Sequence, residues 1–251
     1  MSSVADAWKM VSATASHAHG VSVEEGYSLW APSYDSDPNP LLALEERRLL
    51  PLLPDLSGKV VVDVACGTGR WLEKLLSRGT RSSVGVDLSS AMLEPARGKR
   101  GLRGRLIRAD AIRLPVAPAI ADFTLCSFAL AHFAELDPLA RELARVTKPQ
   151  AELFVSDVHP EAYAKGWQTA FRAGTVAVRI TTFPHSVAEV GAAFRTAGFE
   201  LRQLIEAQLG EPERPIFVRA GKGDRFREVC GIPAVLICCF RRKAPESERT
   251  T

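Results

Sequence analysis

The sequence has no long apolar run and few cysteines. No stretch approaches the roughly 20 consecutive apolar residues of a membrane helix, and the first residues, which include Asp6, lack the apolar region and cleavage site of a signal peptide. Only 5 of the 251 residues are cysteines; none has CxxC spacing or a histidine at a zinc-ligand distance, and three lie in apolar runs typical of strands. We therefore expect a cytoplasmic protein with no membrane contact, no disulfide framework and no metal site.

The charges of the chain are nearly balanced. Lysine and arginine together number 32 and the acidic residues 29, while apolar residues make up 46% of the sequence, as in ordinary globular proteins. One basic run extends from Arg97 to Arg108, and its spacing is more typical of a solvated helix end and loop than of a nucleic-acid site. Nucleic acid is therefore not an expected partner.

From residue 59 onward, short runs rich in β-branched residues alternate with helical segments. The expected strands cover residues 59–65, 82–88, 105–110, 120–129 and 151–158. This alternation is typical of βαβ units, which build a parallel sheet with helices on its faces. The chain is therefore predicted to have an α/β fold.

The alternation breaks after the fifth of these strands. Residues 159–183 fit an insertion between that strand and its helix, which follows at residues 186–198. A sixth strand is expected at residues 199–208 and a last, strongly apolar strand at residues 234–242. The intervening segment 209–229 is rich in glycine, proline and charge, and we expect a long loop there, with room for a helical turn.

The first strand runs into a glycine turn in the stretch VVDVACGTGR. Glycines at positions 67 and 69 allow backbone N–H groups to approach a ligand closely, although such turns also close strand–helix connections that bind nothing. A dinucleotide fingerprint would place a third glycine where this chain has Leu72, and the phosphate motif GxxxxGK is absent. These absences count against a nicotinamide cofactor and against nucleoside triphosphates.

Acidic residues end the next two strands. Asp87 can accept both hydroxyls of a ribose, or it can cap the helix that follows. Asp110 can accept from an adenine amino group while the N–H of Ala111 donates to a ring nitrogen, or it can belong to an ordinary turn. Because the ends of parallel strands meet at one edge of the sheet, the glycine turn and the two acids together predict a single ligand site.

These stretches resemble the class I S-adenosylmethionine-dependent methyltransferases, and more narrowly the bacterial small-molecule group that includes the ubiquinone and menaquinone C-methyltransferases. The matching stretches are VVDVACGTGR, GVDLSSAML, RADAIRLP, ADFTLCSFALAHF, LARVTKPQAELFVSD, SVAEVGAAFRTAGF and the aromatic YSLWAPSYD. The chain departs from the family pattern at Ala65 and Gln150, where the family often has glycine.

The resemblance implies a Rossmann-like, doubly wound sheet of seven strands with the last strand antiparallel. It also implies one methyltransferase domain with an N-terminal helical cover and an insertion after the fifth strand. Within that domain, residues 1–57 would form a lid region, 58–158 a cofactor-binding half and 159–243 a substrate-side half, with a tail at 244–251.

The resemblance also implies S-adenosylmethionine as the cofactor and assigns residues to each part of it. The methionine end would lie at Asp63 and the turn Ala65, Gly67 and Gly69. The ribose would lie at Asp87, and the adenine at Leu88, Met92, Asp110 and Ala111. Ser127 and Phe128 would lie near the sulfonium, and Tyr27, Trp30 and Tyr34 would form a lid whose aromatic faces stabilise its positive charge.

The implied activity is methyl transfer to an oxygen, nitrogen or carbon atom of a small molecule. His132 is the first candidate for a general base, with a structural histidine as the alternative, and Asp157 is the second. His159 and His185 rank behind them. Trp167, Phe171 and Phe183 fit an apolar substrate pocket or simply the core.

Two other functions stay open from the sequence. One is a protein that binds S-adenosylmethionine without transferring its methyl group, or uses the site for another reaction. The other is a nicotinamide-dependent oxidoreductase, against which Leu72 and the pair Asp110–Ala111 both count. A homodimer also stays open.

Overall fold

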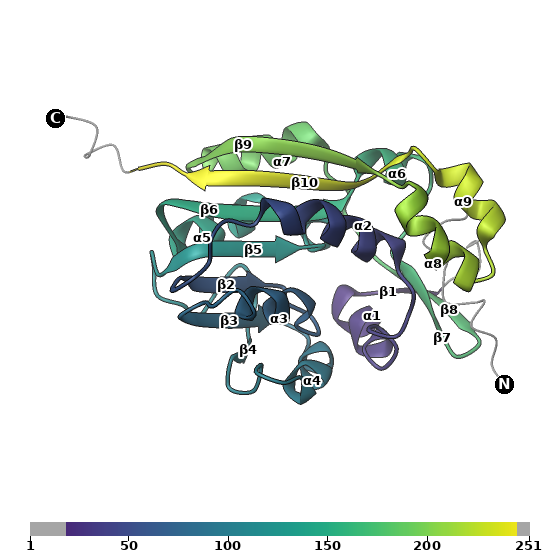
Figure 1. The fold of residues 1–251 in the computed structure, drawn as a ribbon, viewed down its shortest axis with the longest axis horizontal. Helices are drawn as coiled ribbons and strands as arrows, with labels where there is room; N and C mark the ends of the chain where they lie inside the picture. Colours follow the sequence, from purple (N-terminus) through teal and green to yellow (C-terminus); the bar gives the residue numbers. More distant parts are fainter. Residues whose placement is uncertain (1–18, 245–251) are drawn as a thin grey trace.

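A seven-stranded sheet forms the centre of the molecule, in the order β4-β3-β2-β5-β6-β10-β9 (Figure 1). The structure, a computed structural model, describes residues 19–244, so the expectations for residues 1–18 and 245–251 lie outside the described residues. The strands, in the order of the sheet, are Leu106–Arg108, Ser82–Asp87, Val60–Val64, Ala121–Ser127, Thr147–Val158, Pro233–Arg242 and Phe199–Gln208. The first five pair in parallel, and β10 runs antiparallel to both of its neighbours. This arrangement confirms the predicted doubly wound sheet with an antiparallel last strand.

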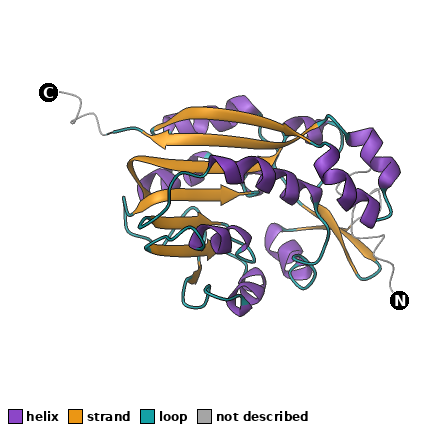
Figure 2. Cartoon of the chain, in the orientation of Figure 1, coloured by secondary structure: helices purple, strands orange, loops and turns teal. Residues whose placement is uncertain are grey.

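Helices cover both faces of the sheet (Figures 1 and 2). On one face, α2 (Pro40–Leu49) and α3 (Arg70–Leu76) place leucines and Trp71 in one core cluster with β2, β5 and β10. On the other face, α5 (Asp137–Val146) and α7 (Val187–Thr196) contribute to a second cluster. Because helices cover both faces, the central strand β2 is fully buried along its length, which explains its nearly continuous valine sequence.

The N-terminal segment and the insertion fold together beside the carboxyl edge of the large sheet. Strand β1 (His19–Val21) pairs in parallel with β8 (Val176–Ile180), which in turn pairs with β7 (Ala170–Ala173) to form a separate three-stranded sheet. Helix α1 (Val23–Trp30) packs on this small sheet. The insertion also holds the short helix α6 (Pro160–Ala164). The break in the strand–helix alternation is therefore the β7–β8 hairpin, against which β1 and α1 of the N-terminal segment pack.

Gly26 allows the close approach of α1 to the small sheet. A Cβ atom at this position would lie 2.4 Å from Cγ1 of Ile180, a distance that no real contact tolerates. The same contact is reinforced by Trp30, whose ring stacks on that of Phe171 with centroids 4.9 Å apart. Gly26 and Trp30 therefore fix the aromatic N-terminal segment to the insertion.

The expected loop at residues 209–229 is wrong. The structure has a short 3₁₀ turn (Glu211–Glu213) followed by helices α8 (Arg214–Arg219) and α9 (Gly223–Val229). Pro215 and Gly223 lie in the first turns of these helices, where such residues are tolerated, whereas Gly221 lies in the turn between the helices with a φ of 68°. Burial of apolar side chains from both helices against the core stabilises them.

The fifth strand also differs from the expectation, because β6 begins at Thr147 rather than at residue 151. Gln150 lies within it with a φ of 63°, in the left-handed region that favours glycine. The pairing of β6 with β5 shifts register in this part of the strand. Gln150, where the family usually has glycine, therefore lies at a shift in the β5–β6 register and not in a turn.

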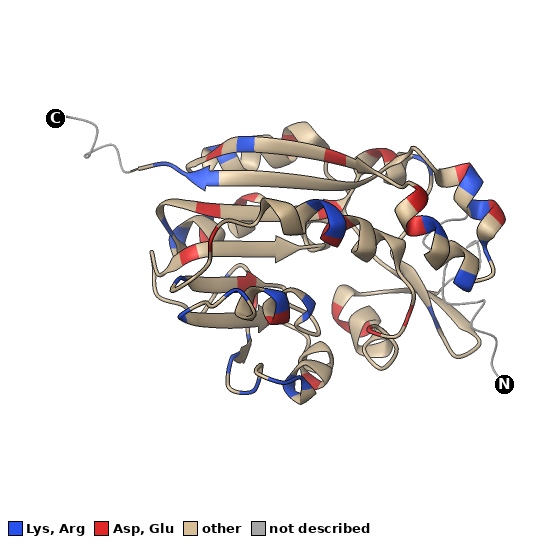
Figure 3. Ribbon diagram, in the orientation of Figure 1, with Lys and Arg blue, Asp and Glu red and all other residues tan. Residues whose placement is uncertain are grey.

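Helix α4 (Ser90–Gly98) and the turn that leads to β4 carry the basic run (Figure 3). Arg97 pairs with Glu94, Lys99 with Asp35, and Arg108 with Glu24. Two of these three ion pairs connect the run to the N-terminal segment.

Among residues 19–244, no helix is long and apolar enough to cross a membrane. Within the same residues, no three His, Cys, Asp or Glu side chains are grouped in a way that could hold a metal ion.

Candidate functional site

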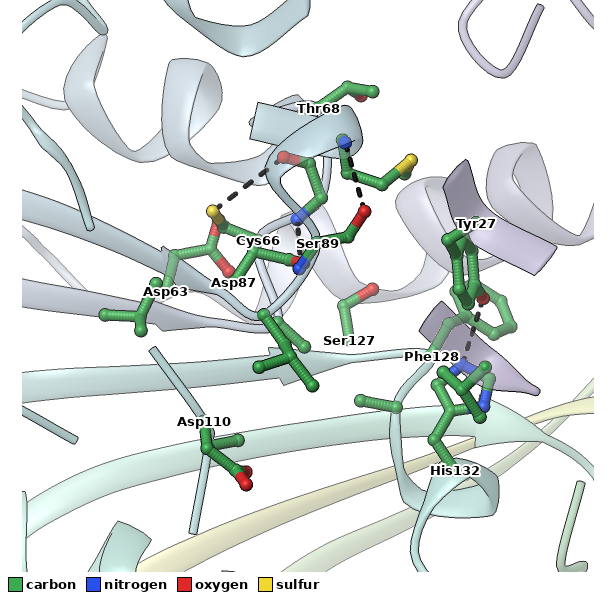
Figure 4. Close-up of a pocket in the computed structure, with 18 of the residues that line it drawn as sticks. Tyr27, Asp63, Cys66, Thr68, Asp87, Ser89, Asp110, Ser127, Phe128 and His132 are labelled. Carbon is green, nitrogen blue, oxygen red and sulfur yellow. Dashed lines mark hydrogen bonds between the residues drawn. The ribbon is translucent and has the colours of Figure 1, made fainter. Parts of the chain in front are cut away.

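The carboxyl ends of β2, β3 and β5 open into a cavity of about 300 Å³ (Figure 4). Segments far apart in the sequence form its walls: the glycine turn, the turns after β3 and β4, the end of β5, and the N-terminal segment with α1. Most of the residues predicted to bind the cofactor line this cavity, namely Tyr27, Tyr34, Asp63, Ala65, Gly67, Asp87, Leu88, Met92, Asp110, Ala111, Ser127 and Phe128.

Gly69 does not line the cavity, and its requirement for glycine is conformational. Its φ is 78°, and a Cβ atom would lie 2.4 Å from Cδ1 of Leu102. Gly67 has a φ of 55° and does line the cavity, as does Ala65, which adopts a φ of 56° despite having a side chain. Ala65 therefore adopts the left-handed backbone conformation that a glycine at this position of the family motif adopts readily.

Leu72 replaces the third glycine of the dinucleotide fingerprint, and the structure shows how the chain accommodates it. The leucine is fully buried against β3, where a Cβ atom on Gly85 would lie 2.8 Å from Cδ2 of Leu72 and from Sγ of Cys66. Helix α3 thus still packs closely on the sheet. The glycine that allows this approach is Gly85 on β3, whereas the dinucleotide fingerprint has its glycine on the helix.

Asp63, at the end of β2, is a buried carboxyl group with one unsatisfied oxygen. Its Oδ2 atom has no hydrogen-bond partner among the described residues. Burial raises the pKa of Asp63 to about 8, although the neighbouring Arg70 partly opposes this effect. A carboxyl group in this state favours a cation or a hydrogen-bond donor in the cavity.

Asp87 joins the glycine turn to the end of β3. Its Oδ2 accepts from the N–H of Gly67 at 2.7 Å and its Oδ1 from the N–H of Ser89 at 2.8 Å. Burial raises the pKa of Asp87, and these two backbone N–H groups partly offset that rise. Ser89, rather than Asp87, caps α4, because its side chain accepts from Met92. The carboxylate thus shapes the turn and still faces the cavity.

Two exposed apolar side chains, Leu88 and Ile112, lie at the mouth of the cavity. Between them in the wall are Asp110 and the buried Ala111; Asp110 accepts through Oδ1 from the N–H of Ile112 at 3.1 Å. Large apolar side chains exposed at a cavity mouth are typical of a site that covers them with a flat ligand.

His132 and Tyr27 meet at the far wall of the cavity. The Tyr27 hydroxyl and Nε2 of His132 are 2.9 Å apart, and the two rings make an edge-to-face contact (Figure 4). Nδ1 of His132 is buried with no hydrogen-bond partner among residues 19–244. Burial lowers the pKa of His132 to about 4, so the ring is neutral at physiological pH.

Asp157 does not line this cavity. Its carboxylate accepts from the N–H groups of Ala131 and Val158 at 2.7 and 2.6 Å, and burial raises its pKa to about 6. Because Ala131 directly precedes His132, Asp157 fixes the turn that carries the histidine. Trp30 is also absent from the cavity wall, since its indole N–H donates to Asp37 at 2.9 Å and its ring packs on Phe171.

The remaining candidate residues lie away from the cavity. His159 caps α6 through Nδ1, and His185 contacts the carbonyl of Phe133. Trp167 and Phe171 are core residues, whereas Phe183 is exposed.

Several residues that line the cavity were not predicted from the sequence, chief among them Arg70 and Ile112. Each directly follows a predicted site residue, so neighbourhood in the sequence was the available signal. Glu45, a fully buried acid on α2 that accepts from Arg70, was not predicted either. Glu45 could not be found from local sequence, because its partners lie on other elements.

Residues 61–150 match a family described as a methyltransferase domain. The chain is 30% identical over 224 residues to an uncharacterized methyltransferase of Emericella nidulans, covering 73% of this chain and 78% of that protein. It is 31% identical over 177 residues to a demethylmenaquinone methyltransferase of Deinococcus radiodurans, covering 68% and 70%. An S-adenosylmethionine-dependent methyltransferase structure from Mesorhizobium loti shares the fold, with a TM-score of 0.63, 21% identity, and coverage of 81% and 100%.

The chain belongs to the class I S-adenosylmethionine-dependent methyltransferases. Its cofactor is S-adenosylmethionine, and its reaction is methyl transfer. The family, the fold and the cofactor predicted from the motifs are thereby confirmed, and the nicotinamide alternative is set aside.

Proposed function

We propose that the cavity at the carboxyl edge of the sheet holds S-adenosylmethionine, with its methionine end at Asp63. The observation that carries this assignment is the buried, unpaired Oδ2 atom of Asp63. An unsatisfied carboxylate oxygen in a protein interior costs free energy, and a ligand ammonium group offsets that cost. The residues present therefore fit the α-amino group of the cofactor.

We assign the ribose and the adenine of the cofactor to other residues that line the same cavity. Asp87 accepts the ribose hydroxyls with the lone pairs that Gly67 and Ser89 leave free. The adenine lies between Leu88 and Ile112, with its polar edge at Asp110 and Ala111. The apolar side chains at the mouth of the cavity thus become covered.

The bound cofactor supplies an activated methyl group on a positively charged sulfonium. Around the position where this group would lie, the chain offers the aromatic rings of Tyr27, Tyr34 and Phe128. Aromatic faces stabilise a diffuse cation by about 0.5–2 kcal/mol per contact, and they exclude water from the reacting atoms. Positioning and desolvation are therefore the main contributions of these residues.

We assign the acceptor to the side of the cavity formed by Tyr27, Phe128 and His132. A second cavity of about 30 Å³ shares these three residues and is also lined by Trp30, by Asp157 and, from the insertion, by Tyr163 and Thr169. The insertion would thus contact the acceptor while residues 58–158 hold the cofactor, which is the proposed division of the domain.

His132 is proposed to accept a proton through Nδ1 when the acceptor is a hydroxyl. Because burial holds its pKa near 4, this uptake is favourable only from an atom that methylation has made strongly acidic. Asp157 acts indirectly in this proposal, by holding the turn of His132.

Calorimetric titration with S-adenosylhomocysteine tests the cofactor assignment without knowledge of the acceptor. Asp63→Ala should weaken binding by about 10- to 150-fold, the loss of one charge-assisted hydrogen bond. Glu73→Ala on α3, which does not line the cavity, is the matched control and should bind normally. Unchanged affinity in a folded Asp63→Ala protein would place the methionine end elsewhere.

A further inference from the structure

Two segments that are far apart in the sequence form one unit, which we name the cap: residues 19–37 and the β7–β8 hairpin at residues 170–180. Strand β1 pairs with β8, and α1 packs on the small sheet through Gly26 and Trp30 (Figure 1). Their apolar side chains form a core cluster of their own, apart from the two clusters of the large sheet. We therefore expect the cap to move as one body.

The cap covers one side of the cavity through its N-terminal part alone. Tyr27 and Tyr34 line the cavity, whereas no residue of the hairpin does so in the described part of the chain. The hydroxyl of Tyr27 also meets Nε2 of His132 at 2.9 Å. A ligand that fills the cavity therefore touches α1 but not the hairpin.

Asp35 connects the cap to two elements on the other side of the cavity. Its Oδ1 accepts from Oγ1 of Thr68 in the glycine turn at 2.6 Å, and its Oδ2 lies 2.8 Å from Nζ of Lys99 at the end of α4. Thr68 is buried and lines the cavity. One carboxylate thus fastens the cap to the glycine turn and to α4.

The other ion pair between the cap and this side of the cavity, Glu24 with Arg108, is more exposed. Its side chains are 57% and 54% exposed, so solvent screens their attraction and the pair contributes little. The side chain of Thr68 is buried, and a hydrogen bond to a charged acceptor is about twice as strong as a neutral one. Asp35 therefore makes the main charged contact that holds the cap closed.

We infer that Asp35 is the latch of the cap, and that the cofactor enters and leaves the cavity when its contact with Thr68 opens. The inference rests on the proposed placement of S-adenosylmethionine in this cavity. Because Tyr27, Trp30 and Tyr34 of the cap also line the second cavity, the same opening exposes the acceptor side. Asp35 is thus a positioning residue, which acts through the closure of the cap.

The competing explanation is that Asp35 only shapes the glycine turn, and ligand kinetics separate the two roles. A latch closes the empty and the occupied cavity alike. Its loss should therefore raise the association and dissociation rates of S-adenosylhomocysteine together, by about tenfold, and keep Kd within about threefold. Loss of a residue that only shapes the turn should weaken binding, mainly through faster dissociation.

Stopped-flow fluorescence measures both rates, since Trp30 lies in the cap. We expect Asp35→Ala and Thr68→Val each to accelerate both rates, and Thr68→Val to have no further effect in the Asp35→Ala protein, because the two changes remove the same hydrogen bond. The control Glu94→Ala removes an exposed acid that pairs with Arg97 within α4, and it should leave both rates unchanged.

Hydrogen exchange of the hairpin tests whether the cap moves as one body. S-adenosylhomocysteine should slow exchange at residues 170–180 together with α1, and Asp35→Ala should reduce this protection. The inference is overturned if the ligand protects α1 alone, or if Asp35→Ala leaves the rates unchanged or accelerates only dissociation. If the unmodified protein does not bind S-adenosylhomocysteine, the proposed cofactor site itself has failed; if it binds and these comparisons fail, only the latch has failed.

Discussion

Replacement of Asp63 with asparagine should stabilise the ligand-free protein at alkaline pH. Burial raises the pKa of this carboxyl group from 3.8 to about 8. Between these values the unfolded chain has lost the proton and the folded protein keeps it. The free energy of unfolding therefore falls as the pH rises through this window and levels off above about pH 8. An asparagine side chain does not titrate, so the variant lacks this contribution.

The size of the effect follows from the width of the window. One pKa unit corresponds to about 1.4 kcal/mol, so about three pH units between pH 5 and pH 8 give at most about 4 kcal/mol. Structural relaxation around the ionised group reduces this figure, and we expect about 2–4 kcal/mol. Asp157 also has a raised pKa, but its contribution is common to both proteins and cancels in the difference. The charge of Asp87 is one of the causes that raise the pKa of Asp63, so its influence is already included in this figure.

Urea unfolding of both proteins at several pH values between about 5 and 8 measures this difference. The stability of Asp63→Asn relative to the unmodified protein should grow steadily with pH. With saturating S-adenosylhomocysteine at about pH 8 the advantage of Asp63→Asn should shrink by about 1.4–3 kcal/mol, because only the unmodified protein gains the ammonium–carboxylate pair. A difference in unfolding free energy that is constant with pH would refute the reasoning, since Asp63 would then be ionised at its ordinary pKa.

Three further predictions concern other parts of the site. Asp87→Ala should weaken S-adenosylhomocysteine binding by about 10- to 150-fold in calorimetry, whereas Ser186→Ala, which removes the cap of α7 away from the cavity, should cost about 1 kcal/mol of stability and little affinity. Gly85→Ala should destabilise the protein by about 1–3 kcal/mol in chemical unfolding, because the new methyl group meets Leu72 and Cys66; Gly191→Ala in α7, with open space around it, should be neutral or stabilising, and similar stabilities for the two would contradict the packing argument. Hydrogen exchange of residues 27–34 should slow when S-adenosylhomocysteine is added, since Tyr27 and Tyr34 line the cavity; exchange that ignores the ligand would reduce this segment to packing.

The cofactor-side residues could be predicted from the sequence because each stands at the end of a strand. Asp63, Asp87 and Asp110 follow recognisable β-branched runs, and the parallel topology brings such ends to one edge of the sheet. Here a local pattern and one topological rule were sufficient to predict that these three acids line the cavity.

Residues whose direction depends on tertiary packing could not be predicted in this way. Trp30 and Tyr27 are neighbours on α1, yet Trp30 turns to Phe171 and Tyr27 to His132, because the insertion packs on only one side of the helix. Asp157 ends a strand like the other acids, but backbone N–H groups occupy both of its oxygens.

The network of Glu45 and Arg70 illustrates a second limit. Glu45 lies within a leucine-rich helical pattern next to Glu46, and nothing local distinguishes the buried acid from the more exposed one. Its burial arises because α2 packs across α3 and the ends of β5 and β6, which brings its donors together from distant parts of the chain.

A crystal structure of the protein with S-adenosylhomocysteine tests the central claim most directly. We expect the ligand in the cavity at the carboxyl edge of the sheet, with its ammonium group at Oδ2 of Asp63 and its ribose hydroxyls at Asp87. Its sulfur should face the space between Tyr27, Phe128 and His132. A ligand bound outside this cavity, or bound with its amino-acid end away from Asp63, would contradict the claim.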